Sequence, residues 1–136
     1  MSKSNTNTTE IEQEIGSEVD HFVYRVPKKN HDAMMQLNKK FADIMRNYGA
    51  AHLIFQLNNT EAPMMEGITN IANTVSSTQD EEVWMELIFY RDRKRKDEVG
   101  AKMQNDKSMH SLYQQSLGLL SPGTNYVMGE FNRLKI

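Results

Sequence analysis

Strict alternation of side-chain type over residues 82–90 is the feature that most constrains the fold of this 136-residue chain. Successive side chains of a β-strand point to opposite faces of its sheet, so a period of two predicts a strand. One face of this strand carries Val83, Met85, Leu87 and Phe89, and the other carries Trp84, Glu86, Ile88 and Tyr90. Residues 51–57 alternate in the same way, with Leu53, Phe55 and Leu57 opposite His52, Ile54 and Gln56. Both runs are therefore predicted to be strands.

The first half of the chain adds a further strand and a helix. Residues 21–26 are rich in β-branched and aromatic types and stop at Pro27, as a strand ending in a turn does. Between Asn30, a suitable N-cap, and Gly49, a suitable C-terminal stop, apolar residues recur at steps of three and four. This stripe, which predicts one amphipathic helix, consists of Met34, Leu37, Phe41, Ile44, Met45 and Tyr48.

The second half completes the pattern. A long polar connection over 58–80 has room for two helical turns, a charged helix is expected from Asp92, and a second helical piece over 107–117. Residues 126–131 form the last predicted strand. The order is β-α-β-β-α-β, which predicts an α+β, ferredoxin-like fold with a four-stranded antiparallel sheet and both helices on one face.

Composition limits the classes of protein. Residues 1–20 are polar and acidic and predict a disordered tail, which leaves 21–136 as a single domain. The absence of Cys excludes disulfides, zinc–thiolate sites and iron–sulfur clusters. No apolar run is long enough to span a membrane, so we expect no membrane partner and a cytoplasmic location.

Helices on one face leave the other face of the sheet without cover. We expect the aliphatic positions, Leu53 and Val83 among them, to lie under the helices. The opposite face then carries Ile54, Trp84, Ile88 and Tyr90 mixed with His52, Gln56 and Glu86. An apolar patch of this kind is rarely left in contact with water. The sequence therefore predicts a homodimer in which two sheets pack face to face.

Four short segments resemble the YbaA-like proteins, a family of unknown function in the dimeric α/β-barrel superfamily. They are Val26-Pro27-Lys28-Lys29-Asn30, Tyr48-Gly49-Ala50, Met103-Gln104-Asn105-Asp106 and Met128-Gly129-Glu130-Phe131. The similarity covers roughly residues 21–131. It implies the fold and the dimer but no catalytic residues, since the superfamily includes monooxygenases, haem-degrading enzymes, lactone isomerases and stress-responsive proteins.

His52 and Glu86 are the candidate catalytic residues, because the predicted topology places them on one face of neighbouring strands. A histidine–carboxylate pair can act as acid or base near neutral pH. Trp84, Tyr90 and Ile54 would form the apolar wall of a ligand pocket, and Arg25 could hold an anionic group if its strand presents it there. The alternative interpretation is that these residues only fill a dimer interface.

Metal and nucleic-acid sites are not expected. The four histidines have no metal-binding spacing, so we predict neither a metal nor another cofactor. The basic run over 91–96 is interrupted by Asp92 and followed by two acids, which favours a solvated helix face over a nucleic-acid surface.

Three functions remain open at this point. The first is binding of a small aromatic or lipophilic molecule between the sheet and its helices. The second is a cofactor-independent monooxygenase or isomerase that uses His52 and Glu86. The third is a non-enzymatic stress-response or interaction protein. A cavity beside these residues would favour the first, and a fully packed interface the third.

Overall fold

The computed structural model describes residues 15–136, so most of the predicted tail, residues 1–14, lies outside the described part. The helices and strands follow in the order β1 (Glu18–Pro27), η1 (Lys28–Asn30), α2 (His31–Tyr48), β2 (Ala51–Gln56), α3 (Ile71–Thr74), β3 (Glu81–Tyr90), α4 (Arg93–Gln104), α5 (Lys107–Leu119) and β4 (Val127–Asn132). The protein is therefore α+β, as predicted. It does not match the six-element order exactly, because α3 stands in the connection where two helical turns were possible, and the two helical pieces expected after β3 form the separate helices α4 and α5.

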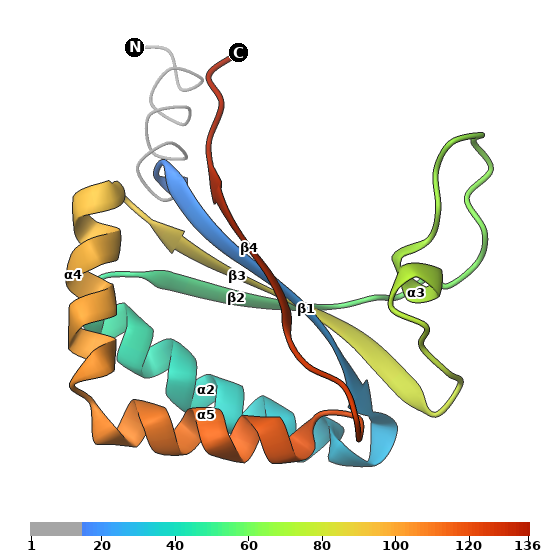
Figure 1. Ribbon diagram of the computed structural model, residues 1–136, viewed down its shortest axis with the longest axis horizontal. Helices are drawn as coiled ribbons and strands as arrows, with labels where there is room; N and C mark the ends of the chain where they lie inside the picture. Colours follow the sequence, from blue (N-terminus) through green and yellow to red (C-terminus); the bar gives the residue numbers. More distant parts are fainter. Residues whose placement is uncertain (1–14) are drawn as a thin grey trace, which may run out of the picture.

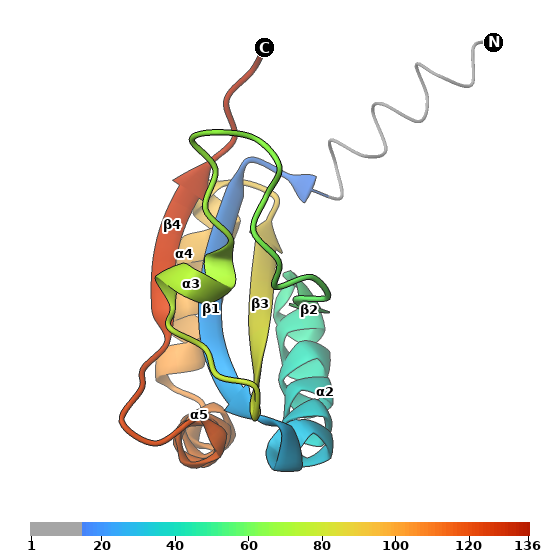
Figure 2. The same ribbon diagram turned by 90° about the vertical axis from the view of Figure 1, so that its right-hand side faces the viewer.

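The four strands form one antiparallel sheet in the order β2-β3-β1-β4. Helices α2 and α5 lie side by side along one face of this sheet, and α4 stands across one end of the same layer (Figure 1). The segment that contains α3 extends away from the helices (Figures 1 and 2). Among residues 15–136, the long helices cover one face of the sheet, and the other face is covered only at one end, where the α3 segment lies near Arg25 and Val83.

β1 begins at Glu18, three residues before the predicted start at His21. Acidic composition made residues 18–20 resemble the tail, but Asp20 is buried in the structure. Its carboxylate accepts a hydrogen bond from Tyr90 Oη at 3.0 Å and lies 3.0 Å from Lys96 Nζ. These two partners offset the cost of burying the charge.

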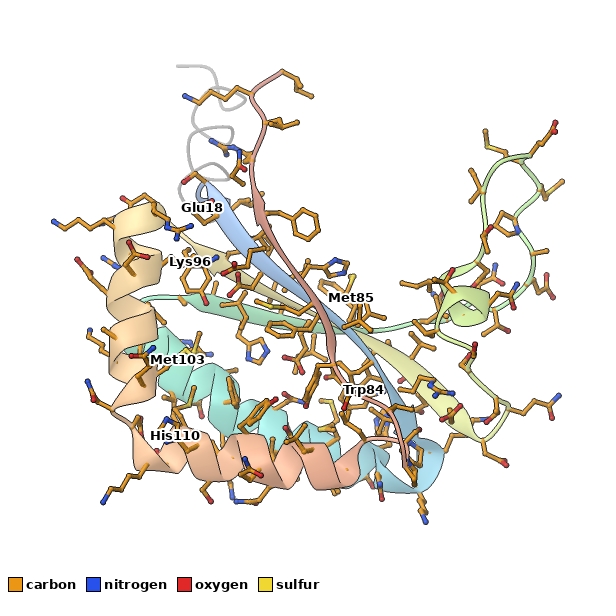
Figure 3. The ribbon with its side chains drawn as sticks, viewed as in Figure 1. Glu18, Trp84, Met85, Lys96, Met103 and His110 are labelled. Carbon is orange, nitrogen blue, oxygen red and sulfur yellow. The ribbon has the colours of Figure 1, made fainter. Side chains whose placement is uncertain are left out.

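The prediction of which sheet face lies under the helices was wrong. Trp84, Glu86, Ile88 and Tyr90 are buried beneath the helices, whereas Leu53 and Phe55 on the opposite face remain 48% and 44% exposed. Both faces of β2 and β3 are rich in apolar residues. Alternation shows which residues share a face, but it does not show which face the helices cover. The larger aromatic side chains face the helices, where they bury more apolar area. Trp84 and its neighbour Met85 accordingly lie on opposite sides of the sheet (Figure 3).

Helix α2 ends where the sequence predicted. Gly49 follows the helix in the left-handed conformation, with φ of 98°. A Cβ at this position would collide with the guanidinium of Arg95, which donates a hydrogen bond to Gly49 O at 3.1 Å. Asn30 occupies the predicted N-cap position but does not cap the helix, because its side-chain amide donates to Leu119 O at 3.1 Å.

We expect Gly49→Ala to lower the free energy of unfolding by about 1–2 kcal/mol, because an L side chain is disfavoured at this φ and would displace Arg95. Gly100→Ala in α4 is the matched control, since a Cβ there meets no atom within 4 Å. The control should raise stability by roughly 0.5–1 kcal/mol through helix propensity. Urea denaturation of both variants measures the difference, and equal effects would contradict the role given to Gly49.

Candidate ligand-binding site

A cavity of about 330 Å³ lies between the helix-covered face of the sheet and the helices. Residues of β1, β3 and β4 form its floor, and residues of α2, α4 and α5 close it from the other side. Lys96 and Met103 enter the cavity from α4 (Figure 3). Five aromatic rings contribute to its walls, namely Phe22, Phe41, Tyr90, Tyr113 and Tyr126.

Glu86 is the buried acid on the floor of this cavity. It is 7% exposed, and its two carboxylate oxygens have different partners. Tyr24 Oη donates a hydrogen bond to Oε1, and His52 Nε2 lies 3.0 Å from Oε2. Burial and the adjacent carboxylate both raise the pKa of Tyr24, so this phenol stays a hydrogen-bond donor.

The tautomer of His52 follows from its surroundings. A carboxylate accepts hydrogen bonds, so the contact with Glu86 places a proton on Nε2. Nδ1 is buried and has no partner among the described residues. A second proton on Nδ1 would leave a buried N–H without an acceptor, which is costly. The geometry therefore places an N–H donor of His52 against Glu86.

A second polar group closes the end of the cavity next to α4. Lys96 Nζ lies 3.0 Å from Asp20 Oδ1 and 2.8 Å from Glu130 Oε1, and 5.8 Å from the centre of the Tyr90 ring. Burial lowers the pKa of Lys96, but hydrogen bonds to the two carboxylates outweigh this effect and leave the pKa raised. The same ammonium lowers the pKa of Glu130. Lys96 is therefore a charged group with two of its donors already used.

The structure brings some of the predicted site residues together. Glu86 and Tyr90 line the cavity, and His52 lies behind Glu86 as its hydrogen-bond partner. Trp84 and Ile54 do not line it. Both pack in a neighbouring core cluster with Tyr24, and the Trp84 indole donates to Glu82 Oε1 at 3.0 Å. Other side chains fill the space around these two residues, so neither reaches the cavity.

Arg25 does not join the site. It alternates with the buried Tyr24 and Val26 and therefore lies on the uncovered face of the sheet. There Nη1 donates to Ser76 O at 2.7 Å and to Glu81 Oε1 at 3.1 Å. The condition for an anion contact in the pocket is therefore not met, because the parity of β1 directs this side chain away from the helices.

Sequence reasoning missed the residues that hold the charged groups of the site in place: Tyr24, Asp20, Lys96 and Glu130. Two signals in the sequence could have indicated them. Asp20 has the same strand parity as Phe22 and Tyr24, and Lys96 shares a helix face with Val99 and Met103.

The basic run of residues 91–96 forms ion pairs within the protein. Arg91 pairs with Asp92, Arg93 lies near Glu18 and Asp97, and Arg95 lies near Glu98. These pairs reduce the charge that the run can offer to a phosphate backbone. Among residues 15–136, no cluster of three or more His, Asp or Glu side chains could hold a metal ion. None of the described helices is both long and apolar enough to cross a bilayer.

The fold and the cavity define a small α+β protein with a ligand-sized chamber beneath one sheet face. Residues 17–117 match the family described as proteins of unknown function (DUF1428), and the chain belongs to this family. No curated protein matches the chain. The family match leaves the function to be argued from the site.

Tyr126, in the cavity wall, should make the protein sensitive to alkaline pH. Burial raises its pKa to about 12, from 10.0 in the unfolded chain. A raised folded-state pKa stabilises the protein fully below pH 10, and this stabilisation is lost as the pH rises toward 12. Between pH 9 and pH 11 the wild type should therefore lose roughly 1 kcal/mol more stability than Tyr126→Phe. Urea denaturation at both pH values tests this, and equal losses for the two proteins would contradict it.

Proposed function

We propose that this protein binds a small, largely apolar molecule in the cavity between sheet and helices, with Glu86 as its polar anchor. The observation that carries the proposal is a carboxylate, 7% exposed, at the floor of a cavity of about 330 Å³. Ligand sites are typically cavities of ~300–1,000 Å³ with apolar walls and a few convergent polar groups. This cavity lies at the lower end of that range and suits a compact ligand.

The cost of burying Glu86 supports a functional role. A buried carboxylate is costly unless hydrogen bonds replace its water, and Tyr24 and His52 supply two of them. Apolar residues at these three positions would pack without that cost. Buried charges in a cleft mark candidate functional sites for this reason.

The second candidate is an enzyme of the monooxygenase or isomerase type without a cofactor. The arrangement of Tyr24, Glu86 and His52 is the observation that favours it. Glu86 would take a proton from the bound molecule, while His52 and Tyr24 hold the carboxylate in place. In this scheme Glu86 is the catalytic base and His52 is a positioning residue.

Filling the cavity tests the binding proposal. Gly100 of α4 lines the cavity, and a Cβ there meets no atom within 4 Å, so Gly100→Leu should place its side chain in the ligand space. Indole serves as a neutral aromatic probe, followed by ¹H–¹⁵N NMR. We expect indole to shift signals of cavity residues in the wild type and to lose at least tenfold in affinity in Gly100→Leu.

Gly118→Leu in α5 is the matched control. Gly118 lies outside the cavity lining and also has open space around it. This control should bind indole like the wild type. Shifts confined to the uncovered sheet face, or undiminished binding by Gly100→Leu, would refute the cavity as the binding site.

We also propose that two copies pair through the uncovered face of the sheet, as members of the dimeric α/β-barrel superfamily related to the YbaA-like proteins. The support is the one-sided arrangement of helices on a four-stranded antiparallel sheet. The uncovered face carries apolar residues from its edge strands to its centre: Leu53 and Phe55 on β2, Met85, Leu87 and Phe89 on β3, and Phe131 on β4. Its charged pair, Arg25 and Glu81, is already joined by an ion pair.

The size of this face suits a dimer. Four strands spaced ~4.8 Å apart and rising ~3.3 Å per residue give an area roughly 20 Å by 20–33 Å. Protruding side chains make the accessible surface larger than this flat area. A standard interface takes about 800 Å² from each partner, so a sheet of this size is of the right order.

Leu53→Glu should produce a monomer, because each copy would bury an unpaired carboxylate in the interface. Leu53 is half-exposed in the single chain, so its substitution should cost the fold little. Leu117→Glu on α5 is the control, since this exposed residue belongs to the helix layer. Sedimentation equilibrium of the wild type and both variants decides the question, and a monomeric wild type would refute the dimer.

A further inference from the structure

The charge balance of the cavity lining restricts its ligand more narrowly than its shape does. The charged side chains that line it are Asp20, Glu86, Glu130 and Lys96. Three carboxylates thus face one ammonium. Lys96 does not offset Glu86, because its Nζ lies within 3.0 Å of both Asp20 and Glu130. The space around Glu86 is therefore negative.

Glu86 has hydrogen-bonding capacity left. An ionised carboxylate can accept about four hydrogen bonds. The structure shows two, from Tyr24 and from His52, one on each oxygen. The remaining lone pairs belong to a residue that lines the cavity, and they can accept N–H or O–H donors of a ligand. A ligand group at this position must donate a hydrogen bond.

The walls add a second preference. The faces of aromatic rings attract cations, and the attraction grows where water is excluded. Phe22, Phe41, Tyr113 and Tyr126 line the same cavity as Glu86. The protein already shows such a contact at one end, where Lys96 Nζ lies 5.8 Å from the centre of the Tyr90 ring.

From these observations we infer that the ligand is an organic cation: an apolar body, bound among the aromatic rings, with a protonated nitrogen that donates to Glu86. The inference rests on the proposed function and names its ligand class. A cation would neutralise the buried charge of Glu86 and use its open lone pairs. An anion would be repelled by the carboxylates of the lining, and Lys96 is already paired with Asp20 and Glu130.

Three probes with one indole body separate the classes: tryptamine is a cation, tryptophol is neutral, and indole-3-acetate is an anion. Calorimetry and NMR with the wild type measure their affinities near pH 7. We expect tryptamine to bind at least tenfold more tightly than tryptophol, and indole-3-acetate to bind most weakly. Signals that shift with tryptamine should come from residues around Glu86.

Glu86→Gln removes the negative charge and keeps the shape of the side chain. In this variant tryptamine should bind no more tightly than tryptophol, whose affinity should change less than about threefold. Glu98→Gln, on the exposed side of α4, is the matched control and should behave like the wild type. The comparison of the three probes on the wild type stands even if Glu86→Gln fails to fold.

The outcomes separate this inference from the function on which it rests. Equal binding of tryptamine and tryptophol, or tighter binding of indole-3-acetate, would overturn the cationic class and leave the cavity as a binding site. Full tryptamine affinity in a folded Glu86→Gln would also overturn it. If none of the three probes binds in the cavity, the inference and the binding proposal both fail.

Discussion

Coverage of the sheet by one layer of long helices is the constraint on which the rest of this structure depends. Among the described residues, α2, α4 and α5 form this layer, and the opposite face carries only the short α3 segment at one end (Figures 1 and 2). One face of the sheet becomes the core and the floor of a cavity, while the other presents Leu53 and Phe55 to the outside. The proposed ligand site and the proposed dimer follow from the two faces of one sheet.

Buried polar groups then distinguish the cavity from ordinary core. Glu86 is held by Tyr24 and His52, and Asp20 is held by Tyr90 and Lys96. Each pair of donors offsets the cost of removing a carboxylate from water. The two groups stand on the same sheet face, so one chamber contains both. These fixed groups set the charge of the chamber.

The sequence predicted much of this fold because its signals are local. Helix α2 and its Gly49 terminus, both strands with strict alternation, and the charged helix that was expected to start near Asp92 are confirmed. The prediction that His52 and Glu86 lie together also agrees with their 3.0 Å contact. Their functional roles stay predictions. The start of β1 was misplaced, since the burial of Asp20 depends on partners seventy or more residues away.

What the sequence determined by itself is therefore the set of strands and helices and the division of each strand into two faces. The tertiary structure decided which face the helices cover. Strand parity is a local property, but the choice of face depends on how residues far apart pack, and here both faces are apolar enough to serve. That choice put Glu86 and Tyr90 in the cavity, sent Arg25 to the opposite side, and brought Lys96 from a surface-like basic run into the site.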